Sequence, residues 1–339
     1  MELSAFDFPF DPSLVASQPL LPRDRARLLV LDRRTNRLGH RQVADLPALL
    51  EPGDLLVVND TKVLAARVMG TKQPAGTPVE VLFVKDLGEG CWEIMVKGTC
   101  RAGQVIEFDG SCRATIVKRD ATGTTVKMES ARPVEEFLRE RGQMPLPPYI
   151  KRKPGREDHD WYQTAFAKHE GAIAAPTAGL HFTPELLARL AARSVGVAAI
   201  TLHVGPGTFK PVVAERIEDH QMGEERFEIG AEAAEAIART KQAGRRVVAV
   251  GTTVVRTLET VAQAQGRIVP AGGESRLFIT PGFQFQAVDA LMTNFHLPRT
   301  TLLMLVSAFA GIETVRQMYD EAVKERYRFY SYGDAMLIL

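Results

Sequence analysis

Residues 247–259 read VVAVGTTVVRTLE, an unbroken apolar run followed by a glycine, two threonines and a helix-forming segment. Four consecutive apolar residues are typical of a strand that is buried on both faces. After residue 151 the same alternation of strand and helix continues to the end of the chain. It predicts a mainly parallel sheet flanked by helices, the α/β class. The strands are predicted at 197–203, 247–250, 276–279 and 335–339, and the helices at 160–169, from Thr183 onward, 231–243, 253–264, 301–310 and 313–326.

A different pattern occupies residues 63–128. Short runs rich in β-branched residues alternate there with turn clusters such as Gly88-Glu89-Gly90, and no helical segment separates them. This pattern indicates a small antiparallel barrel or sandwich. The stretch MPLPPY at 144–149 is too rich in proline for regular structure and predicts a domain connection. We therefore predict a discontinuous α/β domain, residues 1–62 and 150–339, with a small antiparallel β-barrel domain, residues 63–149, inserted in it.

The 339 residues carry 42 Lys and Arg against 41 Asp and Glu, a formal net charge of +1. This balance argues against a surface that is basic throughout, but it allows a local basic patch. Cys91, Cys100 and Cys112 are odd in number and fit no zinc-binding spacing, so we expect reduced thiols rather than a disulfide framework. Residues 1–14 do not resemble a signal peptide, and the apolar segment 302–310 is too short to span a membrane. We expect a cytoplasmic protein.

Polar residues and glycines follow several of the apolar strands, at the edge where α/β sheets place their ligands. Three of the seven histidines lie in such loops, and histidine titrates near neutral pH. We expect at least two of the three to line one pocket, although each by itself is equally consistent with a core histidine. The glycines are also consistent with a tight turn, and Thr253 with an ordinary helix cap. The candidate residues are Thr177, His181, His203, Gly205, Gly207, Gly251, Thr252, Thr253, Asn294 and His296.

Basic residues gather in two segments in spite of the balanced net charge. Residues 22–41 contain seven arginines against two aspartates, and Lys151, Arg152, Lys153 and Arg156 follow Tyr149. Basic side chains beside aromatic rings are suited to a phosphate backbone and to unpaired bases. A solvated hairpin and a solvated linker are the alternative interpretation. The arginines of the first segment are Arg23, Arg25, Arg27, Arg33, Arg34, Arg37 and Arg41.

The common catalytic signatures are missing from the sequence. It contains no dinucleotide-binding Gly-x-Gly-x-x-Gly, no phosphate-binding P-loop, no Gly-x-Ser-x-Gly and no His-Glu-x-x-His. These absences argue against dinucleotide enzymes, P-loop NTPases, α/β-hydrolases and zincin proteases.

Eight segments, in order along the chain, resemble one known family. They are similar to motifs of the S-adenosylmethionine:tRNA ribosyltransferase-isomerases of queuosine biosynthesis, the QueA family, and the similarity extends from about residue 6 to the C-terminus. The segments are GDLLVVNDTK (53–62), MPLPPYI (144–150), YQT (162–164), AAPTAGLHFT (174–183), LHVGPGTF (202–209), VGTTVVRTLE (250–259), VDALMTNFHLPRTTLLML (288–305) and YGDAM (332–336).

The resemblance implies an α/β fold with an inserted β-barrel, and a specific reaction. Such enzymes transfer the ribosyl part of S-adenosylmethionine to 7-aminomethyl-7-deazaguanine at the tRNA wobble position. They isomerise it to give epoxyqueuosine, with release of adenine and methionine. S-adenosylmethionine is then a co-substrate, no cofactor or metal is implied, and we expect a monomer.

The resemblance also suggests roles for named residues. We expect proton transfer from His181, His203, Asp289 or His296, without assigning which is acid and which is base. Arg256 and the helix start at Gly251, Thr252 and Thr253 are suited to the methionine carboxylate, and Thr177 and Asn294 to the ribose hydroxyls, with Gly205 and Gly207 in the same site. The residues expected to bind tRNA are Arg23, Arg25, Arg33, Arg34, Tyr149, Lys151 and Arg152.

Two positions depart from the family pattern. Lys62 stands where the family often has arginine, and Gly223 stands where a second histidine is expected, while His220 and Glu225 stay candidates. Two other classes compete with this interpretation. A tRNA-binding module without chemistry explains the basic segments but not the loop histidines. An enzyme acting on phosphosugars explains the glycine loops but not the basic segments.

Overall fold

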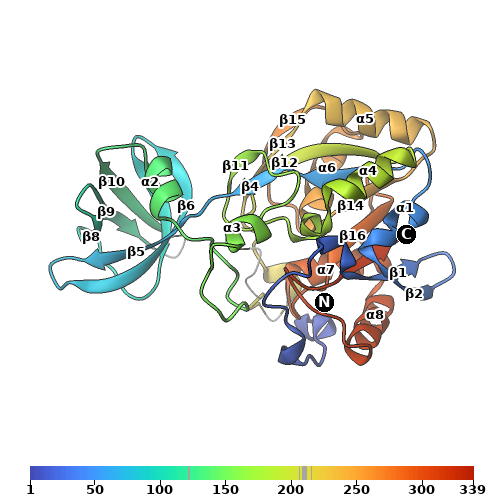
Figure 1. The fold of residues 1–339 in the computed structure, drawn as a ribbon, viewed down its shortest axis with the longest axis horizontal. Coiled ribbons are helices and arrows are strands. Elements are labelled where there is room, and N and C mark those ends of the chain that lie inside the picture. The colour runs from blue at the N-terminus through green and yellow to red at the C-terminus, as the bar shows by residue number, and fades with distance from the viewer. Residues whose placement is uncertain (121–122, 206, 208–211, 215) are drawn as a thin grey trace.

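The computed structural model describes residues 1–120, 123–205, 207, 212–214 and 216–339. Figure 1 shows two bodies, a large layered one that contains both chain ends and a smaller barrel at one extremity of the molecule. This architecture confirms the predicted fold class. The domain boundaries at 62/63 and 149/150 stay predictions.

The large body is built on one nine-stranded sheet. Its four central strands, β12, β3, β14 and β16, are mutually parallel, and antiparallel pairs flank them on both sides. The carboxyl ends of the central strands therefore meet at one edge of the sheet, which we call the carboxyl edge, and their starts meet at the amino edge. In spatial order the strands are β15 (Ala271–Ser275), β13 (Glu225–Ile229), β12 (Gly196–Leu202), β3 (Leu55–Asn59), β14 (Val247–Val250), β16 (Ala290–Asn294), β17 (Ala335–Ile338), β1 (Arg27–Asp32) and β2 (Arg37–Gln42).

Both faces of β3, β14 and β16 are buried, because successive strand residues point to opposite sides and helices pack on each side. In β3, Leu55 and Val57 belong to one apolar cluster, whereas Leu56 and Val58 belong to the other. The first cluster includes side chains of α5 (Ala231–Gln242), α6 (Thr252–Gln265), α7 (Thr301–Ala310) and α8 (Ile312–Lys324). The second includes side chains of α1 (Leu46–Leu49) and α4 (Pro184–Ala192). As predicted, Thr183 caps α4, its hydroxyl accepting a hydrogen bond of 3.1 Å from the Leu186 N–H.

The smaller body is a closed antiparallel barrel with its own apolar core. Phe83 and Trp92 lie in this core, and Phe137 and Leu138 of α2 (Val134–Arg141) pack onto it. At the junction with the large body, β4 (Thr61–Val63) pairs in parallel with β11 (His169–Ala172). The barrel strands are β5 (Arg67–Lys72), β6 (Thr77–Gly88), β7 (Cys91–Val96), β8 (Val105–Asp109), β9 (Cys112–Arg119) and β10 (Thr124–Ser130).

Two predicted elements are wrong. The helix expected at 160–169 is a single turn, α3 (Asp158–Trp161), and the chain then enters β11. The strand expected at 276–279 is irregular, and the neighbouring strand is the glycine-rich β15 before it. Leu277 and Phe278 pack against the core without a strand, which explains why their apolar character misled the prediction. Within the described part of the chain, no helix is long and apolar enough to cross a membrane.

Candidate functional site

A pocket lies at the carboxyl edge of β14 and β16. Segments far apart in the sequence build it: η5 (Thr177–His181), the start of α6, the end of β16 and the loop before β17. The lining residues are Tyr149, Ala175, Pro176, Thr177, Ala178, Val204, Gly251, Thr252, Thr253, Thr293, Asn294, Phe295, His296, Leu297, Thr300, Leu302, Tyr330 and Ser331.

The N-terminus of α6 forms one wall of the pocket. Gly251 has a φ of +97°, a backbone conformation that favours glycine, and this turn joins β14 directly to the helix. Thr252 and Thr253 follow in the first helical turn and line the pocket. Because helix N-termini carry partial positive charge and unpaired N–H groups, this wall suits an anionic group such as a carboxylate.

Asn294 connects the pocket wall to His181. Its Oδ1 accepts a hydrogen bond of 2.9 Å from the Thr177 hydroxyl, and its Nδ2 lies 3.1 Å from Nε2 of His181 and 3.2 Å from the Tyr330 carbonyl oxygen. His181 is buried, and this burial, together with the charges of Arg23 and Arg328, lowers its pKa to about 4. The imidazole is therefore neutral at physiological pH.

His296 lines the pocket itself. Its Nε2 lies 2.8 Å from the Thr293 hydroxyl, and its backbone N–H donates a hydrogen bond of 2.7 Å to the Tyr319 hydroxyl. Burial lowers the pKa of His296 to about 3, so this imidazole is also neutral near pH 7.

His203 lies apart from the two other histidines. Its Nδ1 is 2.8 Å from the Thr61 hydroxyl, and its half-buried ring packs where a side chain at Gly171 would stand. Burial lowers its pKa. Among the described residues that line the pocket, its neighbour Val204 is present but His203 is not. The structure thus places His296 in the pocket wall and connects His181 to that wall through Asn294. His203 lies beside the pocket.

Asp289 was expected to lie with the histidines at the pocket, and this placement is wrong. Asp289 precedes β16 and therefore lies at the amino edge, whereas Asn294 ends the same strand at the carboxyl edge. Its carboxylate accepts hydrogen bonds of 2.7 Å from Lys241 Nζ and 2.8 Å from the Val247 N–H. Asp289 is only five residues before Asn294 in the sequence. This short spacing does not show that the two residues lie at opposite ends of one strand.

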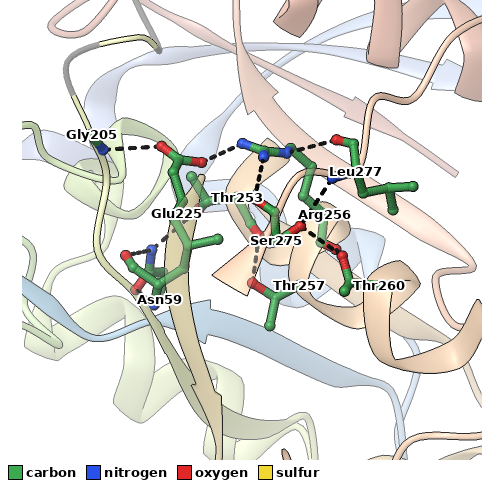
Figure 2. A network of polar contacts seen from close by, with 10 residues as sticks. Asn59, Gly205, Glu225, Thr253, Arg256, Thr257, Thr260, Ser275 and Leu277 are labelled. Atoms are coloured by element: carbon green, nitrogen blue, oxygen red, sulfur yellow. Dashed lines mark hydrogen bonds and ion pairs between the residues drawn. The ribbon is translucent and has the colours of Figure 1, made fainter. Parts of the chain in front are cut away.

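Arg256 is buried and bound to the protein rather than exposed to the pocket. Its guanidinium forms an ion pair with Glu225 and donates a hydrogen bond of 3.1 Å to the Leu277 carbonyl oxygen, as Figure 2 shows. The other oxygen of Glu225 accepts a 3.0 Å hydrogen bond from the Gly205 N–H. The expected contact of Arg256 with a substrate carboxylate is therefore replaced by an internal contact that ties α6 to β13 and to the loop after β12.

The predicted glycine loop is described only in part. Gly205 is held by Glu225, and Gly207 is exposed. Positions 206, 208 and 209 of the predicted loop lie outside the described residues.

The residues expected to bind tRNA are divided between the two edges of the sheet. Arg33 and Arg34 follow the end of β1 and lie at the amino edge, where Arg33 donates to the Asp289 carbonyl oxygen. Arg23 and Arg25 precede β1 and lie at the carboxyl edge, because the start of β1 pairs with Ala335, which pairs with Asn294.

Of the two expected residues before β1, Arg25 is exposed, whereas Arg23 donates to the carbonyl oxygens of Asp160 and Gln163. The basic segment near residue 150 is divided in the same way. Lys151 is exposed, whereas Arg152 forms two hydrogen bonds, of 2.6 and 2.7 Å, with the buried Asp158. Tyr149 lies in the pocket wall, and its hydroxyl is 2.6 Å from the Ser331 hydroxyl. The seven residues expected to bind tRNA therefore do not share one edge of the sheet.

Several pocket residues escaped the sequence interpretation. Thr293, which contacts His296, and Tyr330 with Ser331 line the pocket without having been selected. Thr293 lies between the predicted site residues Asp289 and Asn294 of one motif, and this position was the signal in the sequence that could have identified it. Among the described residues, no group of three or more His, Cys, Asp or Glu side chains is placed to hold a metal ion.

Comparisons with known proteins agree on one family. Residues 3–338 match the model of the family described as queuosine biosynthesis protein. A protein of Pelobacter propionicus and one of Carboxydothermus hydrogenoformans, both named S-adenosylmethionine:tRNA ribosyltransferase-isomerase, are 48% and 50% identical to this chain over the full length of both chains. The crystal structure of S-adenosylmethionine tRNA ribosyltransferase from Thermotoga maritima is similar with a TM-score of 0.59 and 38% identity. The match covers 99% of this chain and 100% of that one.

Proposed function

The chain belongs to the queuosine biosynthesis protein family, and from this membership we propose that the pocket at the carboxyl edge binds S-adenosylmethionine. The chain is an enzyme with the activity of that family. It transfers and isomerises the ribosyl moiety of S-adenosylmethionine onto the 7-aminomethyl-7-deazaguanine wobble base of tRNA. The products are epoxyqueuosine-tRNA, adenine and methionine.

One observation carries the assignment of the pocket. The N-terminus of α6 and the Thr177–Asn294 pair line the same pocket. The helix N-terminus suits the carboxylate of the methionine part, and the hydroxyl and amide suit the ribose. The aromatic side chains of Tyr149, Phe295 and Tyr330 supply apolar surface for the adenine ring.

We assign proton transfer to His296. Of the three predicted histidines it is the one that lines the pocket, and one ring nitrogen of a neutral imidazole carries a lone pair. The sulfonium group acidifies the adjacent ribose carbon, so a base beside the ribose promotes the loss of adenine. His203 stays a second candidate, since it lies next to the pocket residue Val204.

The tRNA is proposed to approach at the carboxyl edge. Arg25 and Lys151 are exposed basic residues suited to its phosphates, and the wobble base lies in a single-stranded loop that needs no duplex opening. We further propose a cytoplasmic monomer that takes S-adenosylmethionine as co-substrate and needs no cofactor or metal. Full turnover after dialysis against a chelator, with a monomer mass by light scattering, is the expected result.

Adenine release tests the proposed function. Wild-type protein is incubated with S-adenosylmethionine and tRNA that carries or lacks the 7-deazaguanine base, and adenine is quantified. We expect adenine with the modified tRNA, a strong loss in Asn294→Ala, and wild-type release in Glu235→Ala, whose side chain is exposed on α5. Absence of adenine with the modified tRNA would overturn the proposal for the reaction. Full activity of Asn294→Ala would overturn the assignment of the pocket.

A further inference from the structure

We propose that Thr177 determines specificity for a ligand hydroxyl group by presenting only acceptor lone pairs to the pocket. We also propose that His181 is a positioning residue that acts through Asn294 rather than by transferring a proton. This inference rests on the proposed function, since it takes the ligand to be the ribose of S-adenosylmethionine. Its basis is a chain of hydrogen bonds whose direction the structure fixes.

The orientation of the Asn294 amide is the first step. Its Nδ2 lies 3.2 Å from the carbonyl oxygen of Tyr330, and only an N–H group can bond to that oxygen. The reverse orientation would place the Asn294 oxygen against another oxygen. The nitrogen of Asn294 therefore faces Tyr330 and His181, and its oxygen faces Thr177.

The tautomer of His181 follows from this orientation. Because Asn294 Nδ2 is a donor, Nε2 of His181 accepts the 3.1 Å hydrogen bond and carries no proton. The proton of the neutral ring is therefore on Nδ1. Among the described residues that line the pocket, Asn294 is present but His181 is not. His181 thus contacts Asn294 from outside the pocket, where it orients the amide rather than exchanging a proton with a ligand.

The direction of the Thr177 hydroxyl is the last step. Asn294 Oδ1 can only accept, so the hydroxyl proton of Thr177 points to it at 2.9 Å. The remaining lone pairs of the half-buried Thr177 oxygen are then acceptors in the pocket wall. They suit a ligand group that donates, such as a ribose hydroxyl, and they repel an ether or carbonyl oxygen at the same place.

Calorimetric binding of S-adenosylmethionine and of its 2′-deoxy and 3′-deoxy analogues tests the specificity. We expect one analogue to bind the wild-type protein roughly 10- to 100-fold more weakly, because the acceptor is left unpaired. Thr177→Val should bind S-adenosylmethionine and that analogue alike, whereas Thr177→Ser should keep the discrimination. Equal wild-type binding of all three compounds would overturn the inference alone. No binding of S-adenosylmethionine would overturn the proposed function with it.

Two substitutions of His181 test the positioning role. Glutamine places an acceptor oxygen near the position of Nε2, so His181→Gln should keep the analogue discrimination, a kcat within a few-fold of wild type and an unchanged pH profile. His181→Leu supplies no acceptor and should lose the discrimination, with circular dichroism as the check on folding. A His181→Gln protein that binds S-adenosylmethionine normally but loses turnover, or shifts the pH profile, would show proton transfer by His181 and overturn the inference.

Discussion

The two edges of the central sheet carry polar residues of different kinds. At the amino edge, charged side chains pair with each other: Asp54 with Arg246 and Asp289 with Lys241. At the carboxyl edge, Thr177, Asn294 and His181 are neutral and hydrogen-bonded in series beside a helix N-terminus. The first edge neutralises its own groups, whereas the second, beside the internal Glu225–Arg256 ion pair, also leaves hydrogen-bonding capacity directed into a pocket.

This contrast shows why polar residues at strand ends are not sufficient evidence of a site. A carboxylate that already binds a cation and a backbone N–H, as Asp289 does, has its main interactions satisfied within the protein. A neutral amide held in one orientation instead determines how neighbouring groups face a ligand. Function at the carboxyl edge and stability at the amino edge are therefore expected to respond to different substitutions.

Asp54→Ala should produce the largest effect, and it should be on stability. Asp54 is buried and accepts hydrogen bonds from the Arg246 guanidinium and from the N–H groups of Glu51 and Arg246. Its removal leaves Arg246 without its partner, so we expect the free energy of unfolding to fall by about 3–5 kcal/mol. Urea denaturation measures this loss. A variant that binds S-adenosylmethionine more weakly at unchanged stability would break the contrast between the edges.

The pH dependence of the free energy of unfolding should reveal a buried neutral histidine, His296, at the carboxyl edge. Burial holds the pKa of His296 near 3, whereas an unfolded histidine titrates near 6.5. Below pH 6.5 the unfolded chain binds a proton that the folded protein does not, so this histidine lowers stability as the pH falls toward 3. The expected loss is roughly 1.4 kcal/mol per pH unit.

Urea denaturation of wild type and His296→Gln between pH 7 and 4.5 measures this contribution. The difference in unfolding free energy between the two proteins should change steadily below pH 6.5, in favour of the variant. A difference that is constant with pH would contradict a buried neutral His296.

Most of the fold was predictable because its signals are local. The run at 247–250 became β14, fully buried, and the Thr183-Pro184 start became the cap of α4. The strand β5 gives only a weak signal in the sequence because Met69 and Lys72 are not buried and Gly70 weakens the pattern, although the barrel closes through this strand. Its pairing with β6 and β8 is a tertiary effect that no short window of sequence contains.

The site was predictable in its residue types but not in its partners. The sequence predicts Thr177, Asn294 and His296 in loops after strands, and these residues, with Asn294 at the end of β16 itself, are found around one pocket. It does not show that Glu225, thirty-one positions before Arg256, satisfies that arginine, since the contact joins β13 to α6. Charge pairing across a sheet depends on topology, and so the role expected for Arg256 could not be checked from sequence.

Substitutions at the two edges should also differ in their effect on tRNA affinity, but by a smaller amount. Arg25 is exposed at the carboxyl edge and Arg34 at the amino edge, where its side chain is 90% exposed. We expect Arg25→Ala to weaken anticodon stem-loop affinity a few-fold and to reduce the slope of log affinity against log salt by about 1. Arg34→Ala should change neither quantity. Equal losses in both variants, measured by fluorescence anisotropy between 50 and 200 mM salt, would contradict an approach from one edge.

Asp289→Asn should have the smallest effect, and it is the sharpest test of the contrast. The sequence made Asp289 a candidate for proton transfer, whereas the structure places it at the far end of β16 from Asn294. Its contacts with Lys241 and the Val247 N–H are half-exposed, so we expect less than about 1 kcal/mol of lost stability. The kcat and KM for adenine release should stay within about twofold of wild type, because the whole strand separates this carboxylate from the pocket. A large fall in kcat with normal stability would show that the amino edge takes part in the reaction.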